Sequence, residues 1–249
     1  MIDWHYPPTD LALTREDVHV WRVPLDLIDP SYLQGLTRLL AEDEVNRADR
    51  FRFPHHRDHF IIARGTLRLL LGRYLGVDVY RGAFVYNAYG RPSLPALPAE
   101  HPLEFNLSHS GGLALYALSW QRSVGVDVEA MRDIEFEEIA TRFFSPREQA
   151  VLTALPPHQR KDAFFNAWTR KEAYIKARGE GLSLALDAFD VTLTPGDPAT
   201  LLETRDDPVQ ATRWKLQALH AGAGYQAALA VDGGGWQLSC WQWQPPRLA

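Results

Sequence analysis

Residues 162–178 constrain the fold most, because they have the pattern of one long amphipathic helix that carries charged groups at a fixed spacing. Apolar side chains recur there at helical intervals and form a broad flank: Phe164, Phe165, Trp168 and Ile175. Glu172 and Lys176 are four residues apart, so an acid and a base project from one face. Gly179 follows at once and predicts the end of the helix. Taken alone, such a pair is also what an ordinary surface ion pair looks like.

A second acidic pair lies upstream, in residues 124–129, which have the pattern of a buried strand. Asp127 and Glu129 are two residues apart, so on a strand they leave the same face of the sheet. The opposite face is all valine: Val124, Val126 and Val128. Two carboxylates that project together repel each other unless a cation holds them, and Mg²⁺ takes oxygen ligands. With Glu172 and Lys176 they predict a metal and phosphate site, whereas by themselves they fit two solvated acids on a sheet edge.

His109 is a third candidate. It lies among small polar residues at the end of a predicted strand, and two glycines follow that allow close approach of a ligand. This setting favours contact with an anion, although a lone histidine is more often structural. Arg47, Arg50 and Arg52 form a basic cluster further upstream. Arg47 and Arg50 are three residues apart and could grip an anion from a helix, but a charge run of this kind is also typical of a solvated face.

The remaining pattern alternates helices and strands. Helices are predicted over residues 31–40 and 57–75 and from Ser145, where Pro146 and Glu148 complete a helix start. Strands are predicted over residues 18–23, 83–86, 103–109, 113–120 and 124–129, and near Phe189, Trp214, Tyr225 and Gln237. Short connections predict that residues 103–109, 113–120 and 124–129 form an antiparallel meander.

The order of these elements recurs once along the chain. A helix, a long helix that ends in glycine and then strands are found before residue 120 and again after it. The sequence therefore predicts an α+β fold made of two similar halves, residues 1–121 and residues 122–249, with the metal site in the second half.

Composition excludes several classes of protein. The formal charge of −5 does not suggest a nucleic-acid-binding protein. The single cysteine, Cys240, excludes an intramolecular disulfide framework and fits a reducing compartment. No secretion signal is recognisable, and no apolar run approaches the roughly 20 residues that span a bilayer. We therefore expect a soluble, cytoplasmic protein without a membrane or nucleic-acid partner.

Four blocks of this sequence resemble the 4′-phosphopantetheinyl transferases of the Sfp type. They are Tyr89-Gly90-Arg91-Pro92, Phe105-Asn106-Leu107-Ser108-His109-Ser110-Gly111, Val124-Gly125-Val126-Asp127-Val128-Glu129 and Trp168-Thr169-Arg170-Lys171-Glu172-Ala173-Tyr174-Ile175-Lys176-Ala177. Their order and spacing agree with the family over roughly residues 45 to 190. The resemblance implies an enzyme that transfers phosphopantetheine from coenzyme A to a serine of an acyl, polyketide or peptidyl carrier protein. It implies a pseudo-dimer of two α+β halves with coenzyme A in the cleft between them.

The resemblance also implies roles for single residues. Asp127, Glu129 and Glu172 would hold Mg²⁺, or Mn²⁺, and Glu172 would also deprotonate the attacking serine. Coenzyme A would be bound by a larger set. In that set Lys176 neutralises the pyrophosphate with Lys171 beside it, Ser108 and His109 contact the phosphates, Arg91 meets the adenine end, and Arg47, Arg50 and Arg52 are interchangeable candidates for the 3′-phosphate.

Two other functions fit part of the pattern. A non-catalytic module that binds coenzyme A or a carrier protein would need neither a base nor a metal. A Mg²⁺-dependent phosphohydrolase would use the same acids but leave His109 and the order of the blocks unexplained. Since the chain already contains both halves, we expect a monomer.

Overall fold

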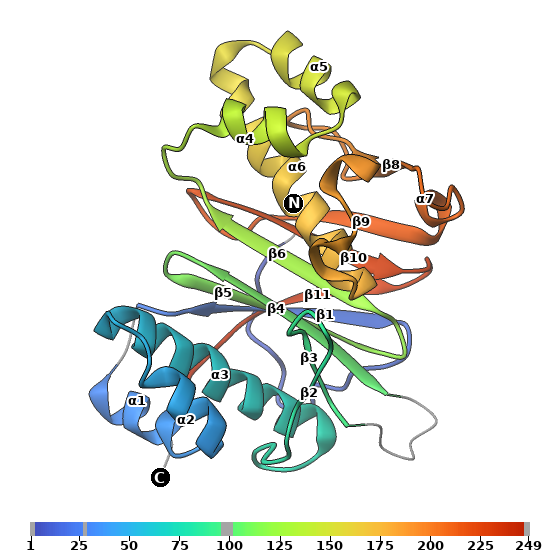
Figure 1. Ribbon diagram of the computed structural model, residues 1–249. Coiled ribbons are helices and arrows are strands. Elements are labelled where there is room, and N and C mark those ends of the chain that lie inside the picture. Colours follow the sequence, from blue (N-terminus) through green and yellow to red (C-terminus); the bar gives the residue numbers. More distant parts are fainter. Residues whose placement is uncertain (1–2, 27–28, 96–101, 247–249) are drawn as a thin grey trace.

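The computed structural model describes residues 3–26, 29–95 and 102–246 (Figure 1). The first part of the chain forms β1 (Asp17–Pro24), α1 (Pro30–Thr37), α2 (Glu42–Ala48), α3 (Pro54–Leu75), β2 (Val85–Tyr86), β3 (Pro92–Ser93), β4 (Leu103–Ser110) and β5 (Leu113–Trp120). The second part forms β6 (Val124–Ala130), α4 (Phe136–Phe143), α5 (Pro146–Ala154), α6 (Pro157–Arg178), β7 (Phe189–Val191), β8 (Leu201–Thr204), α7 (Gln210–Arg213), β9 (Trp214–Leu219), β10 (Tyr225–Asp232) and β11 (Gln237–Gln242), with short 3₁₀ turns at Gly181–Ser183 and Leu186–Ala188. The fold is α+β, as the sequence predicts.

These elements stack in four layers, with helices outside and two sheets inside (Figure 1). Helices α1, α2 and α3 pack on one face of the sheet that contains β1, β4 and β5. The other face of that sheet meets the sheet of β6, β9 and β10 across an aliphatic layer. Helices α4, α5 and α6 cover the far face of the second sheet. Among the described residues, no helix is both long and apolar enough to cross a membrane.

The strand order differs from the predicted meander. Strands β4 and β5 pair antiparallel as predicted, but β6 pairs with β10 in the other sheet. The two sheets have the orders β11-β1-β5-β4 and β6-β10-β9. The meander prediction is therefore wrong for its third strand, because the short connection at residues 121–123 turns the chain from one sheet into the next.

The predicted recurrence of elements agrees with this strand order. The antiparallel run β1-β5-β4 has its counterpart in β6-β10-β9. In each run three helices, α1–α3 or α4–α6, follow the first strand in the sequence and come before the other two strands. Strand β11 has no counterpart in the second sheet. It returns to the first sheet and pairs in parallel with β1, so the last strand lies with the first half of the chain.

Helices α3 and α6 are the longest elements of the two halves, with 22 residues each. Both begin with proline, whose missing N–H costs nothing in the first turn. Both end at a glycine in the left-handed conformation, Gly76 and Gly179, each with φ of 71°. The predicted helix over residues 162–178 is confirmed at its C-terminal end and begins earlier, at Pro157.

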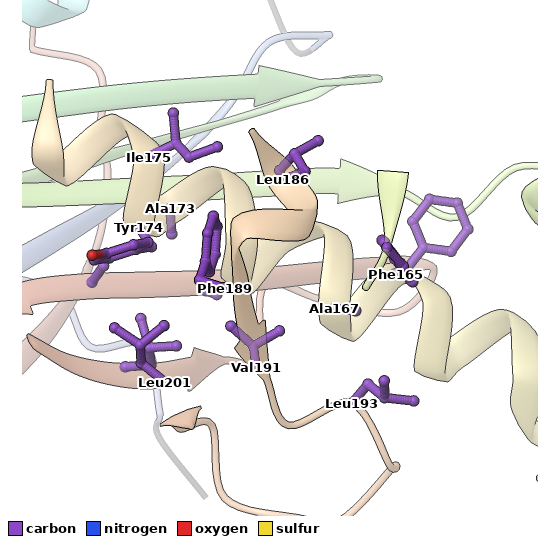
Figure 2. Packing of buried hydrophobic residues seen from close by; sticks show 14 of the residues in the cluster. Phe165, Ala167, Ala173, Tyr174, Ile175, Leu186, Phe189, Val191, Leu193 and Leu201 are labelled. Atoms are coloured by element: carbon purple, nitrogen blue, oxygen red, sulfur yellow. The ribbon is translucent and has the colours of Figure 1, made fainter. Parts of the chain in front are cut away.

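The core of the second half is built around the inner face of α6. Figure 2 shows Tyr174 of α6 beside Phe189 of β7, with ring centroids 4.9 Å apart in an edge-to-face arrangement. Ala173 and Ile175 lie on the same stretch of helix and are also buried. This packing fixes the rotation of α6, so the two residues that flank these apolar positions, Glu172 and Lys176, face away from the core.

Candidate functional site

A cleft of about 420 Å³ lies between the two halves of the chain. Its walls come from α2 and α3, the turn between β2 and β3, strand β4 and the last two turns of α6. Of the predicted site residues, the cleft is lined by Arg47, Arg91, Ser108, His109, Glu172 and Lys176. Residues from distant parts of the sequence therefore meet at one surface.

The centre of the site is a contact between Lys176 and Asp127. Lys176 Nζ lies 2.5 Å from Asp127 Oδ1 and donates a hydrogen bond of 2.9 Å to Ser108 Oγ. The Ser108 hydroxyl in turn donates to Asp127 Oδ1 over 2.8 Å. Asp127 is 2% exposed, and its Oδ2 atom has no hydrogen-bond partner among the described residues. A buried carboxylate oxygen without a partner is costly, which marks Oδ2 as a position that a ligand can satisfy.

Strand β4 holds β6 in place through its side chains. Asn106, Ser108 and Ser110 alternate along β4 and therefore face the same way. Asn106 Oδ1 accepts from the Val126 amide over 2.9 Å, and Ser110 Oγ donates to Glu129 Oε2 over 2.7 Å. These contacts replace a backbone ladder between the two strands and set the position of both strand acids relative to the cleft.

A glycine brings α6 close to β6. A Cβ atom at Gly125 would lie 2.1 Å from the Ala173 carbonyl oxygen and 2.4 Å from the Ala177 amide nitrogen. Only glycine allows such an approach of helix to strand. Because the contact falls within the turns that carry Glu172 and Lys176, it places those side chains next to Asp127.

The carboxylates perturb one another. Burial raises the pKa of Glu172, the charges of Asp127 and Glu129 raise it further, and Lys176 opposes them. Burial likewise raises the pKa of Glu129, and the hydrogen bond from Ser110 partly offsets this. A raised pKa moves a carboxyl group towards the range in which it accepts a proton near neutrality.

The acids do not form a ready-made metal cage. Among the described residues, no group of three or more His, Cys, Asp or Glu side chains is arranged to hold a metal ion. The donor chemistry nevertheless fits a hard cation, since the carboxylates are oxygen ligands and Asp127 Oδ2 is buried without a partner. The Lys176 ammonium contacts the other carboxylate oxygen of Asp127, Oδ1.

His109 stands at the mouth of this region. Its side chain is exposed on one side, yet burial by the cleft walls lowers its pKa, and the positive charges of Lys176, His59 and Arg47 lower it further. The His109 imidazole therefore takes up a proton less readily than a free imidazole. Three nearby positive or protonatable groups indicate that the cleft favours negative charge here.

The three candidate arginines separate in space. Arg47 lines the cleft, and its guanidinium carbon lies 5.2 Å from the centre of the Phe60 ring. Arg50 and Arg52 are exposed and are not among the lining residues. The structure thus distinguishes residues that the sequence left interchangeable.

Arg91 lines the cleft, as predicted for a ligand-binding residue, and it also holds the end of α6. Its guanidinium donates to the Lys176 carbonyl over 2.9 Å and the Ala177 carbonyl over 3.2 Å, and it lies 3.6 Å from Glu104. Arg91 therefore secures the C-terminus of α6 while it lines the cleft. The prediction that it meets the adenine end stays a prediction.

Lys171 requires a correction. Its side chain is completely buried on the far side of α6, with Nζ 2.8 Å from Glu148 Oε2. It also donates to the carbonyls of Leu186 and Phe189. Burial lowers the pKa of Lys171 and raises that of Glu148, while their attraction opposes both shifts. Lys171 does not reach the cleft, because neighbouring residues on a helix point about 100° apart.

One arginine of the cleft wall was not predicted. Arg64 of α3 lines the cleft and is 6% exposed. The sequence signal was available, since Arg64 and Arg68 interrupt the apolar stripe of the 57–75 helix at a spacing of four. A charged pair on the buried face of a helix indicates a partner or a ligand.

Comparisons with known proteins identify the family of the chain. A family model described as the 4′-phosphopantetheinyl transferase superfamily matches residues 123–230. The chain is 43% identical over 241 residues to 4′-phosphopantetheinyl transferase HetI of Nostoc sp., and the matched region covers 96% of this chain and 98% of HetI. It is 38% identical over 170 residues to 4′-phosphopantetheinyl transferase Sfp of Bacillus subtilis, covering 64% of this chain and 74% of that protein.

Proposed function

The chain belongs to the 4′-phosphopantetheinyl transferase superfamily, and we propose that its cleft transfers phosphopantetheine from coenzyme A to a serine of a carrier protein. The observation that carries this proposal is that Glu172, Lys176 and Ser108 line one cleft, where Lys176 and Ser108 both contact the buried carboxylate of Asp127. The carrier is an acyl, polyketide or peptidyl carrier protein, and the other product is adenosine 3′,5′-bisphosphate.

The chemistry is a phosphoryl-type transfer. The carrier serine oxygen forms a bond to the phosphorus that bears the pantetheine arm, and the bond from that phosphorus to the bridging oxygen breaks. The bridging oxygen leaves with adenosine 3′,5′-bisphosphate, and the serine proton passes to Glu172 directly or through a water. The raised pKa of Glu172 suits a base that works near neutrality.

Charge neutralisation is the second requirement of such a reaction. Lys176 leaves Asp127 for the pyrophosphate, and His109 and Ser108 supply further polar contacts. Arg91 contacts the nucleotide end of coenzyme A, and Arg47 is the one of the three candidate arginines that lines the cleft.

We assign the metal position to Asp127, Glu129 and Glu172. These oxygen donors suit Mg²⁺, and Mn²⁺ accepts the same ligands. The bound ion supplies neutralisation of the pyrophosphate charge. The unpartnered Oδ2 of Asp127 supports this assignment.

The architecture proposed with this function is a pseudo-dimer of residues 1–121 and 122–249 that acts as a monomer in the cytoplasm. The recurrence of β1-β5-β4 as β6-β10-β9 supports the two halves, and the cleft lies where they meet. The acidic net charge gives no reason to expect a nucleic-acid partner.

Intact-mass spectrometry tests the function directly. An apo carrier protein incubated with this protein, coenzyme A and Mg²⁺ should gain the mass of one phosphopantetheine, and EDTA should abolish the gain. Coenzyme A binding without any gain on carriers of several types would instead indicate a non-catalytic binding module.

The metal assignment has a separate test. Asp127→Ala should weaken Mn²⁺ binding to the complex with coenzyme A, measured by electron paramagnetic resonance. Loss of a ligand typically costs at least about tenfold in metal affinity. Unchanged Mn²⁺ affinity in the variant would show that the strand acids are not ligands.

A further inference from the structure

A second groove lies between α6 and the edge strand β9, and we call it the β9 groove. Its volume is about 850 Å³, and its walls come from β9, the start of β10, the loop of residues 195–199, and Asn166 and Arg170 of α6. No described residue lines both this groove and the cleft. Arg170 and Glu172 point about 200° apart around α6, so the helix presents opposite sides to the two sites.

The β9 groove runs along the outer edge of its strand. Strand β9 pairs with β10 on one side and is the last in the order β6-β10-β9. Four consecutive residues line the groove: Leu216, Gln217, Ala218 and Leu219. Since side chains alternate between the faces of a sheet, a ligand that meets all four lies against the strand edge. Such an edge presents backbone N–H and C=O groups for pairing with another strand.

Arg170 brings a buried positive charge to this groove. The residue is 3% exposed. Its guanidinium donates to the Thr192 carbonyl over 2.6 Å, to the Thr192 hydroxyl over 3.0 Å and to the Asp197 carbonyl over 3.3 Å. All three acceptors are neutral. Burial lowers the pKa of Arg170 to about 10, and the charge of Asp197 opposes this shift. A buried guanidinium without a carboxylate partner favours an anionic ligand.

The charges of the lining restrict the class of that anion. Besides Arg170, the acidic and basic side chains of the groove are those of Asp197 and His220, and both residues are exposed. A ligand with several phosphates would bring more negative charge than one guanidinium balances. A single carboxylate matches the one buried cation. Amide side chains and apolar side chains make up most of the remaining wall, which suits a neutral peptide backbone and its side chains.

The cleft provides a comparison within the same molecule. It too is lined by four consecutive residues of an edge strand, 106–109 of β4, with a long helix opposite. Strand β4 ends the run β1-β5-β4 as β9 ends the run β6-β10-β9. The cleft also receives the end of α6 from the other half, whereas all described residues that line the β9 groove belong to the second half. The β9 groove thus has a wall fewer than its counterpart.

We infer that the β9 groove binds the C-terminal end of another polypeptide, which adds as a strand to the outer edge of β9 and places its terminal carboxylate on the Arg170 guanidinium. An edge strand that faces a helix, with a cation in the groove between them, provides both parts of this recognition. At about 3.3 Å per residue, the four lining residues of β9 match about four residues of the peptide. This inference does not rest on the proposed function.

Peptide binding to the full chain tests the inference. Heptapeptides with free carboxyl ends would be selected from a random library, and the strongest would be measured by fluorescence polarisation. Conversion of its terminal carboxylate to an amide should weaken binding about tenfold or more, because a charge-assisted contact is lost. Arg170→Gln should weaken the free acid by the same factor and leave the amide unchanged. Arg142→Gln, which replaces an exposed arginine of α4, is the matched control and should bind like the parent.

Hydrogen exchange would locate the bound peptide, since the amides of residues 214–219 should exchange more slowly in its presence. Equal binding of the free acid and the amide by the parent would overturn the role of Arg170, and this comparison remains decisive if Arg170→Gln does not fold. Slower exchange elsewhere, but not in β9, would place the peptide outside the groove. Failure to select any peptide would overturn the whole inference, and binding of coenzyme A by the same preparation would show that the failure concerns the β9 groove alone.

Discussion

Helices α3 and α6 repeat each other in length, in their proline start and in their left-handed glycine end, yet they present different groups to the cleft between them. Each is tied down by a glutamate in the third position of the preceding short helix, Glu44 for α3 and Glu148 for α6. Each glutamate meets a cation on the long helix, Arg68 or Lys171. This glutamate–cation pair, which both helices share, has a structural role. We therefore look for functional residues among the positions at which the two helices differ.

These differences are specific. On α6 they are Glu172 and Lys176, which face Asp127 and the cleft. Counted back from the terminal glycines, the same places on α3 hold Leu69, which is buried, and Arg73, which is exposed and donates to the Pro8 carbonyl. The α6 side thus carries the groups that we propose to react, while α3 contributes Arg64 to the cleft wall. The two helices share a frame and differ in the side chains that they present to the cleft.

The largest effect should come from removing the base on α6. Glu172→Gln should lower kcat for transfer by about 10²–10⁴-fold, since general base catalysis is typically worth that much. Coenzyme A binding should persist, which titration calorimetry would check. Arg73→Gln on α3, at the place that corresponds to Lys176, is the control and should keep its rate within about twofold. Normal turnover by Glu172→Gln would show that Glu172 is not the base, and this proposed difference between α6 and α3 would then be wrong.

The scaffold pairs should differ in their contribution to stability. Lys171→Met leaves Glu148 buried without its cation, and loss of one partner of a buried pair costs about 3–5 kcal/mol. Arg68→Met should cost less, because Arg64 still faces Glu44. Urea unfolding of both variants would measure the difference. Equal losses of unfolding free energy in the two variants would mean that Arg64 does not compensate the charge of Glu44 when Arg68 is removed.

The close contact of α6 with β6 should be the next most sensitive feature. Gly125→Ala forces a methyl group against the Ala173 carbonyl, and such overpacking costs about 1–3 kcal/mol. Because the shift moves Glu172 and Lys176 away from Asp127, kcat should fall as well. Gly234→Ala, where the nearest atom to a new Cβ is 3.9 Å away, is the matched control for thermal unfolding and turnover. A variant with normal turnover would show that this approach does not position the site.

The smallest effect concerns pH. The pKa values of Glu172 and Glu129 are raised above 4.5, so the folded chain holds more protons than the unfolded chain just above that pH. The free energy of unfolding should therefore fall as pH rises through this window. Glu172→Gln should make the fall shallower in urea titrations at several pH values. An equally steep fall in the variant would place the titrating groups elsewhere.

Much of the fold and several residues of the candidate site could be predicted from the sequence. The 3.6-residue period located both long helices, the capping box at Ser145 located α5, and the spacing of Asp127 and Glu129 placed both on one side of a strand whose valines are buried. The four motif blocks indicated the family, which the match to HetI confirms.

What failed depended on contacts between distant segments. Short turns favour hairpins, so β6 was expected to pair with β5. It pairs with β10 instead, and the side chains of Asn106, Ser108 and Ser110 join it to β4. Lys171 is adjacent to Glu172 in sequence, but one step along a helix turned it into the core. Arg64 interrupts an apolar stripe in the sequence, but its partner Glu44 lies on another helix, so the sequence did not show which residue it contacts.

The return of β11 to β1 has a consequence for synthesis of the chain. Their pairing joins residues such as Arg22 and Gln242, which are 220 positions apart, and without β11 strand β1 would be the open edge of its sheet. The first half therefore cannot complete its sheet while the ribosome is still making the second. An exposed strand edge during that interval is a site for mispairing with other chains, and it is covered only once β11 has emerged.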